Sequence, residues 1–487
     1  MASKLLTKSK YVNGLQCLKY LWMLFHEPES VGDPDASTLH TFEQGHLVGE
    51  LAKKVFPEGV NIPPDDFMGN IRRTKELLKQ RKTVFEAGIT TGKIYCRLDI
   101  LKPVNDDEWD IIEVKSSTKI KDVDIEDVAF QKHCCRQAGL EIRNCFLMHI
   151  DNSYVRQGEI DPKQLFAIED ITERVADAVR SVPDKVDMML EVIAAKDCPD
   201  IAIGQQCENP YECLVEGCKD FLPESNVLEL YRGGQKSFEL LNDGILAICE
   251  IPDGFKLSSI QQIQQTCVSS GQPYADPAQL KSFLDSLQYP LYFFDFETFS
   301  TAVPPFDGTH PYQNIPFQFS LHVVKSAASP PEHFSFLADG TADPRPGLLA
   351  ALKKWLGKSG SIIVYNQSFE KRVLEDLGEA FPEYKSWVKG IVGRFIDLLQ
   401  PFRSFWYYHP AQKGSASLKA VMPALTGKGY DGLGISNGEN ASLEFFRVTY
   451  SDVPEEERRR VRQDLEKYCG RDTEGMIWII RAIGELT

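Results

Sequence analysis

The amino-acid sequence predicts an α/β protein with more than one domain. Its 487 residues exceed what a single hydrophobic core usually organises, and common domain sizes indicate two to four domains. Segments with the two-residue period of strands alternate with segments of helical period in both the amino-terminal and the carboxy-terminal part. We expect domains over residues 1–225 and 289–487, joined by a helical connector over 226–288 that shows no chemical motif.

The composition limits the kinds of partner that the chain can bind. An apolar content of 43% is ordinary for a globular protein, and the net charge of −16 (54 basic and 70 acidic residues) argues against a partner held by bulk electrostatics. Nucleic acid would have to contact a local basic surface. No apolar run approaches a membrane span, and residues 1–10 lack the apolar core of a signal peptide, so we expect a cytoplasmic protein.

The first domain is predicted to contain helices followed by strands. Helical spacing of apolar residues occurs over 15–22 and over 42–56, where Pro57 ends the second helix. Strands are predicted over 84–87, 94–101 and 109–116, with a turn at 105–108, and a helix near 127–131 precedes a strand near 145–149.

Asp99, Glu113 and Lys115 carry the candidate chemistry of this domain. Glu113 and Lys115 are two apart on one strand and therefore share a face, while Asp99 lies on the neighbouring strand. Two carboxylates can bind Mg²⁺ or Mn²⁺, and an ammonium beside them can position an attacking water or stabilise phosphate charge. The alternative is an exposed hairpin that carries a cross-strand ion pair.

The surrounding residues resemble those of the PD-(D/E)XK nucleases of the RecB-like type, including CRISPR-associated exonucleases with an iron-sulfur cluster. The resemblance implies a restriction-endonuclease-like domain whose metal is held by His46, Asp99 and Glu113, with Lys115 and Gln131 as catalytic residues. Glu86 matches an acidic position that often precedes the Asp strand. Cys135 stands where the family often has an aromatic residue, which leaves substrate positioning open.

Cysteines indicate a further site. Cys207, Cys213 and Cys218 lie close together in a stretch rich in Pro and Gly, and Cys17 could supply a fourth thiolate. Four thiolates suit a [4Fe-4S] cluster or Zn²⁺, and their spacing does not choose between the two. The nuclease resemblance favours the cluster, because those relatives take one cysteine before the nuclease core and three after it. We expect the others to be packing residues: Cys96, Cys134, Cys135, Cys145, Cys198, Cys249, Cys267 and Cys469.

The carboxy-terminal domain opens with an aromatic strand over 291–297 that holds Asp295 and Glu297 on one face. Further strands are predicted over 317–324 and 361–365, and a helix follows over 369–377. Like charges held side by side repel unless a cation lies between them, so the pair suggests a divalent metal. A surface strand with two acids is the alternative. The aromatic stretch 402–409 could stack bases or pack in a core.

More acids follow downstream. Glu370 opens the helix after the third strand, Asp397 is either a metal-site acid or a helix cap, and Tyr468 and Asp472 share one face of a late helix. This part resembles the DEDDy group of 3'-5' exonucleases, whose fold is of the ribonuclease H type. The resemblance implies two metal ions held by five acids, with Tyr468 orienting the water; those acids are Asp295, Glu297, Glu370, Asp397 and Asp472. The family usually has Asp where this chain has Glu370.

The whole chain resembles an uncharacterised bacterial family that joins a RecB-like nuclease domain to a DEDD-type exonuclease domain. The segments that carry this likeness are 9–17, 112–118 and 292–298. We expect a two-site nuclease that uses Mg²⁺ or Mn²⁺ on DNA, single-stranded or with free ends, in DNA repair or phage defence, with RNA left open. The alternatives are a nucleic-acid-binding adaptor with degenerate sites and a hydrolase of short oligonucleotides.

Overall fold

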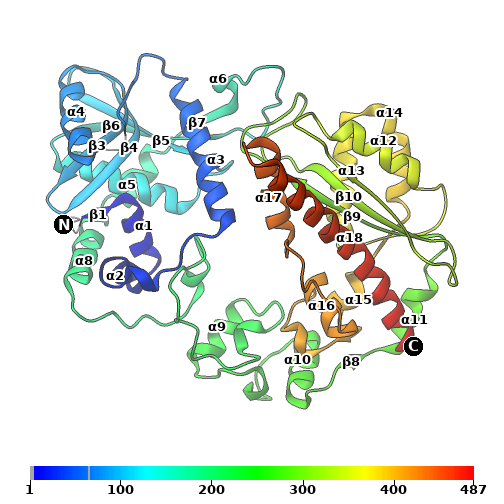
Figure 1. Cartoon of the computed structure of the whole chain (residues 1–487). Coiled ribbons are helices and arrows are strands. Elements are labelled where there is room, and N and C mark those ends of the chain that lie inside the picture. The colour runs from blue at the N-terminus through cyan, green and yellow to red at the C-terminus, as the bar shows by residue number, and fades with distance from the viewer. Residues whose placement is uncertain (1–4, 64–65) are drawn as a thin grey trace. The chain divides into compact units, whose positions relative to one another are not determined.

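The computed structural model describes residues 5–63 and 66–487. Residues 1–4 of the segment 1–10, which lacks the apolar core of a signal peptide, lie outside the described residues. The chain divides into two compact units (Figure 1). The first unit holds residues 1–220 and 301–313, and the second holds residues 221–300 and 314–487. Residues 226–288 therefore belong to the second unit.

The first unit has a seven-stranded mixed sheet covered by helices. Its strands are β1 Leu6–Thr7, β2 Val60–Asn61, β3 Val84–Thr91, β4 Ile94–Pro103, β5 Glu108–Lys115, β6 Glu141–Ile150 and β7 Phe166–Asp170. Its helices are α1 Lys8–Gln16, α2 Leu18–His26, α3 Ala36–Lys53, α4 Phe67–Lys79, α5 Asp122–Gln137, α6 Pro162–Leu165, α7 Thr172–Ala178 and α8 Val182–Ala194.

Strand β4 pairs with β5 along its second half and with β1 at its start. The path is β2-β3-β4-β5-β6-β7, and β4 and β5 are antiparallel and pair from Ile100 with Ile112 to Pro103 with Trp109. Short β1 instead pairs parallel with the start of β4, where Thr7 lies beside Tyr95. The chain enters α1 directly after β1, so Lys8, the first residue of α1, lies close to Asp99 of β4 and Glu113 of β5.

Two apolar cores lie on the two faces of this sheet. Alternate residues of a strand point to opposite faces, and Ile111 belongs to the core that contains Val128 and Phe130 of α5. Its neighbour Ile112 belongs to the other core, with Val48 of α3. Glu113 and Lys115 therefore share the face covered by α5.

The second unit is built on a five-stranded sheet of order β11-β10-β9-β12-β13. Its strands are β8 Tyr274–Ala275, β9 Leu291–Phe299, β10 Ile315–Val324, β11 Glu332–Leu337, β12 Ile362–Val364, β13 Phe395–Asp397 and β14 Tyr407–Tyr408. Its helices are α9 Gln235–Asn242, α10 Ser259–Ser270, α11 Pro277–Asp285, α12 Arg345–Trp355, α13 Gln367–Ala380, α14 Pro382–Val392, α15 Gln400–Arg403, α16 Leu418–Thr426, α17 Gly438–Tyr450 and α18 Glu455–Glu485.

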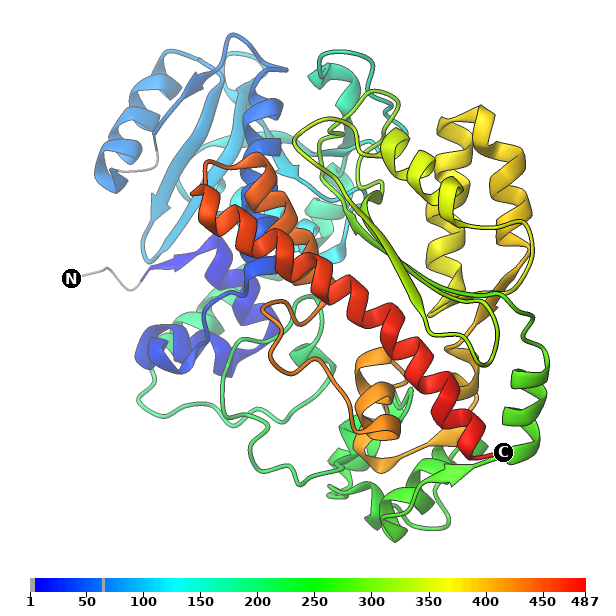
Figure 2. The same cartoon turned by 45° about the vertical axis from the view of Figure 1, so that its right-hand side comes forward.

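Strand β9 lies in the centre of this sheet, antiparallel to β10 and parallel to β12. Phe294 and Phe296 enter the core formed with α12, α13 and α14, while Phe293 enters the core on the opposite face, which contains Met476 of α18. Figure 2 shows α18, coloured orange to red, lying along β9 and β10. Asp295 and Glu297, which share the face of Phe293, are therefore held between the sheet and α18.

The structure confirms the mixed α/β class and decides two smaller points. Within the stretch 402–409, residues Phe402, Phe405, Tyr407 and Tyr408 are all buried, so these four side chains pack in a core. The prediction that Cys249 is a packing residue is wrong, because its side chain is exposed.

Candidate functional site

The first cluster of ionisable side chains forms where β5 meets α5. The Glu113 Oε1 atom accepts hydrogen bonds from Lys8 Nζ at 2.7 Å and from Lys115 Nζ at 2.9 Å. Lys115 also donates to Asp127 at 2.7 Å. On α5, Gln131 Nε2 donates to Glu113 Oε2 at 2.8 Å and to Asp127 Oδ1 at 3.1 Å. Strand and helix are thereby joined through one buried carboxylate.

Asp99 completes this cluster from β4. Its Oδ2 atom accepts the Val114 backbone N–H at 2.8 Å, which ties β4 to β5 beyond their last paired residues. Its Oδ1 atom lies 4.0 Å from Lys8 Nζ. Burial and the neighbouring Glu113 raise the pKa of Asp99 to about 7. Asp99 is thus the member of the cluster whose charge changes near neutral pH.

The other charges of the cluster balance one another. Burial raises the pKa of Glu113, but the Lys115 and Lys8 ammonium groups outweigh it and hold this pKa well below its usual range. For Lys115, burial lowers the pKa, and Glu113 and Asp127 more than reverse the effect. Two lysines therefore neutralise carboxylates that burial alone would protonate.

Among the described residues, no hydrogen bond or ion pair joins the other two predicted residues, His46 and Glu86, to this cluster. His46 is exposed on α3. Glu86 forms ion pairs with Arg97 at 3.0 Å and with Lys53 at 3.3 Å. The structure thus brings together Asp99, Glu113, Lys115 and Gln131. It adds Lys8 and Asp127, which the sequence did not single out.

The donors around Glu113 suit a hard divalent cation, because carboxylate oxygens are its preferred ligands. The Gln131 Oε1 atom is buried and has no hydrogen-bond partner among the described residues, so the cluster keeps one unused acceptor. Lys8 Nζ lies close to both Glu113 and Asp99. A metal held by these two carboxylates would have to replace the Lys8 ammonium.

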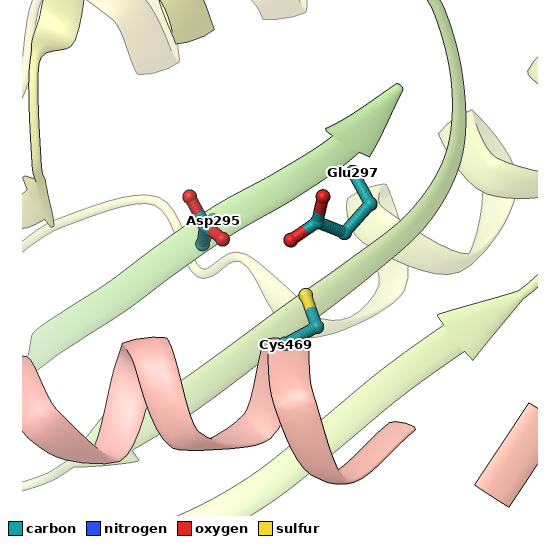
Figure 3. A group of neighbouring side chains, drawn as sticks. All are labelled: Asp295, Glu297 and Cys469. Atoms are coloured by element: carbon teal, nitrogen blue, oxygen red, sulfur yellow. The ribbon is translucent and has the colours of Figure 1, made fainter. Parts of the chain in front are cut away.

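The second cluster lines a cavity of about 430 Å³ in the second unit. Asp295 and Glu297 come from β9, Glu370 from the first turn of α13, and Tyr468 and Asp472 from α18. All five line this cavity. Figure 3 shows the carboxylates of Asp295 and Glu297 close to each other on β9. The structure therefore brings together five of the six residues predicted here.

The acids of this cavity resist ionisation. Burial, followed by repulsion from Asp472, raises the pKa of both Asp295 and Glu297 well above its ordinary value. Burial also raises the pKa of Glu370 to about 8 and that of Asp472 to about 6. Among the described residues, the cation facing the acids is Lys419, which attracts Asp472 and Glu297 but lies in a partly buried position that lowers its own pKa. One ammonium does not balance four carboxylates.

This donor set fits divalent cations. The Glu370 side chain is 2% exposed, and its Oε2 atom has no hydrogen-bond partner among the described residues. A buried oxygen without a partner is costly unless an unseen group satisfies it. Carboxylate oxygens from three separate elements around one cavity are the kind of ligand that Mg²⁺ and Mn²⁺ prefer.

Asp397 lies beside this cavity and has a local structural contact. Its Oδ1 atom accepts the backbone N–H groups of Asn366 and Leu399, each at 3.0 Å. Asn366 has a left-handed backbone (φ 77°) and precedes α13. Asp397 therefore holds the turn that presents Glu370, and its charge adds to burial in raising the Glu370 pKa.

Two residues that the sequence did not assign complete the cavity wall. The Tyr430 hydroxyl donates to Asp472 Oδ1, and its ring lies 5.9 Å from that of Tyr468. Lys419 Nζ lies 5.4 Å from the centroid of the Tyr468 ring. Tyr430 lies in the loop between α16 and α17, where no local sequence pattern identifies it as a site residue.

The four predicted cluster cysteines meet in the first unit. Cys17, Cys207, Cys213 and Cys218 line one cavity of about 260 Å³. Cys17 precedes α2, and the backbone N–H groups of Lys19 and Tyr20 donate toward its sulfur. Burial, opposed by these donors, raises the Cys17 pKa. Four thiols around one cavity fit an iron-sulfur cluster or a zinc ion.

The fold and these sites define a two-unit α/β protein with two acidic clusters and a cysteine cluster, and sequence comparisons point to proteins of unknown function. The family profile described as a domain of unknown function (DUF2779) matches residues 292–417, which include Asp295, Glu297, Glu370 and Asp397. The chain is similar to the "Uncharacterized protein MG366 homolog" of Mycoplasma pneumoniae, with 26% identity over 220 residues. It is equally similar to the "Uncharacterized protein MG366" of Mycoplasma genitalium, with 26% identity over 237 residues.

These matches cover 41% and 45% of this chain and 33% and 35% of the two relatives. The chain therefore spans about a third of the length of the curated relatives it matches. Among the described helices, none combines the length and the apolar character needed to cross a membrane.

Proposed function

We propose that the chain is a two-site, metal-dependent nuclease that hydrolyses phosphodiester bonds in DNA. The observation that carries this proposal is the cavity in which Asp295, Glu297, Glu370 and Asp472 converge from three elements with too little cationic charge to balance them. Such a site gains most from divalent cations, and paired cations on carboxylates serve phosphoryl transfer.

In the second unit the proposal is a 3'-5' exonuclease with a ribonuclease H-like fold. The strand order β11-β10-β9-β12-β13, antiparallel on one side of β9 and parallel on the other, supports that fold. Tyr468 lines the cavity together with Asp472, in the place where a hydroxyl can orient a water. Lys419 supplies positive charge that could meet a phosphate.

In the first unit the proposal is a PD-(D/E)XK nuclease with a [4Fe-4S] cluster. Support comes from the contacts of Glu113 with Lys115 and Gln131, and from the position of Asp99 beside them. The cysteine cavity joins the segment before the nuclease sheet to the segment after it. A cluster bound there would stabilise the unit, because ligand binding adds to the folding free energy.

The residues have separate roles in the proposed reaction. Bound divalent cations would neutralise the phosphoryl oxygens and acidify a water ligand. Lys115 holds the Glu113 carboxylate in its ionised form, and its ammonium would stabilise the charge that develops on the phosphate. Gln131 fixes the orientation of Glu113 from α5. In the other site, the hydrogen bond from Tyr430 orients Asp472.

The two sites are tested by two point variants in an assay with end-labelled single- and double-stranded DNA and RNA. Lys115→Ala should abolish one Mg²⁺- or Mn²⁺-dependent activity and Asp295→Ala the other. Lys119→Ala and Asp285→Ala are matched controls on exposed side chains, and both should cleave like the unaltered protein. If neither site variant changes the cleavage pattern, the two-site proposal is wrong.

A second candidate function is an adaptor whose first site binds nucleic acid without cleaving it. The Lys8 ammonium favours this candidate, because it already neutralises Glu113 at 2.7 Å. It predicts that the first unit binds DNA without cleaving it. Lys115→Ala would then leave DNA cleavage unchanged.

A further inference from the structure

A buried thiol faces the acidic pair on β9. The Cys469 sulfur and one carboxylate oxygen each of Asp295 and Glu297 all lie within 4.8 Å of one another. Figure 3 shows the sulfur of Cys469 directed from α18 toward the two carboxylates. The side chain of Cys469 is fully buried, so its neighbours are fixed by the packing of α18 on β9 and β10.

The surroundings of this thiol differ from those of a packing cysteine. A buried cysteine usually behaves as a small apolar side chain among other apolar groups. Here the Ser320 backbone N–H donates toward the sulfur, and the carboxylates of Asp295 and Glu297 lie beside it. A donor N–H directed at the sulfur favours a thiolate, and a cation is the group that would let a thiolate form beside two carboxylates.

The three ligands form a set distinct from the one that the nuclease resemblance implies. In the set that the resemblance implies, Asp472 joins Asp295 and Glu297 as a metal ligand. In the structure, Asp472 Oδ1 accepts the hydrogen bond from Tyr430. In the tight group the third ligand atom is the sulfur of Cys469. Cys469 lies three residues before Asp472 on α18, so both side chains can approach the same strand from neighbouring turns.

The chemistry of this set selects thiophilic ions. Mg²⁺ takes oxygen ligands in octahedral geometry, whereas Zn²⁺ and Cd²⁺ accept thiolate together with carboxylate. Ligand atoms around a tetrahedral Zn²⁺ are about 3.5 Å apart, given Zn–S near 2.3 Å and Zn–O near 2.1 Å. The limit of 4.8 Å among the three atoms leaves only a small closing movement.

We propose that Asp295, Glu297 and Cys469 form a binding site for a thiophilic divalent cation of the zinc class, which competes with Mg²⁺ or Mn²⁺ and stops hydrolysis in the second unit. Binding of the ion displaces the thiol proton to solvent and forms a metal–sulfur bond, with no change of oxidation state. The ion site itself stands on the geometry, and only its inhibitory effect rests on the proposed function.

The test is a Cd²⁺ titration of the full chain after chelator treatment, followed by the ultraviolet absorbance of cadmium thiolates. Cys469→Ser should bind one equivalent less and lose the absorbance of one thiolate. Cys267→Ser, which removes another buried thiol of the same unit, should match the unaltered protein. The four clustered cysteines contribute equally to all variants and cancel in the difference. Equal stoichiometry and absorbance in Cys469→Ser and the unaltered protein would overturn the proposal.

A second variant protects the test against misfolding. Asp295→Asn keeps the thiol and should weaken Cd²⁺ binding at this site at least about tenfold. Unchanged Cd²⁺ affinity in Asp295→Asn would also overturn the proposal, because the carboxylate would then not be a ligand.

The inhibitory effect is measured separately as the Zn²⁺ concentration that halves Mg²⁺-supported DNA cleavage. That concentration should rise at least about tenfold in Cys469→Ser. If both proteins cleave DNA and Zn²⁺ inhibits them equally, the inhibitory ion site is wrong and the proposed function stands. If neither cleaves nucleic acid while Cys469→Ser still loses one Cd²⁺, the proposed function is wrong and the ion site stands.

Discussion

Lys8 makes the sharpest test of the first cluster, because its ammonium lies where a cation between Glu113 and Asp99 would bind. We predict that Lys8→Met increases the affinity of this site for Mn²⁺. A metal entering the unaltered protein must first break the hydrogen bond at 2.7 Å between Lys8 Nζ and Glu113 Oε1. A hydrogen bond to a charged group contributes about 1.5–3 kcal/mol, and about 1.4 kcal/mol corresponds to tenfold in affinity. Removing that competition should tighten Mn²⁺ binding roughly 10- to 100-fold.

The same change should destabilise the metal-free protein. Removing one partner of a buried ion pair costs about 3–5 kcal/mol, but the Lys8 side chain is 23% exposed and Lys115 remains 2.9 Å from Glu113. We therefore expect a loss of about 2 kcal/mol, which for a unit of this size lowers its Tm by about 4–8 °C. Mn²⁺ should restore most of this loss, because the metal takes over the missing positive charge.

The assay is calorimetric titration with Mn²⁺ and thermal unfolding in chelator, both in an Asp295→Ala background that weakens the second site. Lys10→Met is the matched control, since Lys10 lies on the same helix as Lys8 and its ammonium lies over the Phe25 ring of α2. Equal Mn²⁺ affinity in Lys8→Met and the Asp295→Ala parent would refute the idea that Lys8 occupies the ion's place. Weaker binding would mean that Lys8 supports the metal.

Three further predictions concern the other groups. Between pH 4.5 and 8 the metal-free protein should lose stability as pH rises, because Glu370 has a folded pKa of about 8 and keeps a proton that the unfolded chain releases. Glu370→Gln should remove this part of the pH dependence, which amounts to about a few kcal/mol of unfolding free energy at pH 7. The measurement is the Tm as a function of pH. Identical slopes in both proteins would contradict the prediction. Tyr468→Phe should lower the single-turnover cleavage rate of the second unit about 100-fold with little change in Mn²⁺ affinity, and an unchanged rate would exclude Tyr468 from orienting the water. Cys17→Ser should abolish iron content and visible colour in anaerobically purified protein, whereas a colourless unaltered protein with stoichiometric zinc would end the cluster proposal.

The sequence predicted the elements that follow strong local patterns. Alternation over 291–297 placed Asp295 and Glu297 on one face, and the structure has them on β9 opposite Phe294 and Phe296. The spacing of Tyr468 and Asp472 likewise predicted a shared helical face. Such periodic signals arise from side-chain geometry within one element, so they are visible before the fold is known.

Residues that reach a site through tertiary packing were not predictable in this way. Lys8 approaches Glu113 because β1 pairs with the start of β4, where β5 does not pair with it. No local pattern at Lys8 predicts that pairing. Tyr430 reaches Asp472 from a loop 42 positions earlier in the chain. The sequence around Cys469 shows no cluster of cysteines and so predicts a packing residue, because its carboxylate neighbours Asp295 and Glu297 lie on another element.

The two acidic clusters solve the problem of buried charge in opposite ways. Around Glu113, two lysines supply the positive charge, so the carboxylate stays ionised without any other ion. Around Asp295, Lys419 faces four acids, and the acids retain protons instead. A divalent cation must therefore displace an ammonium in the first site and protons in the second. Mn²⁺ binding should consequently release more protons in the second site than in the first, which makes its affinity the more pH-dependent of the two.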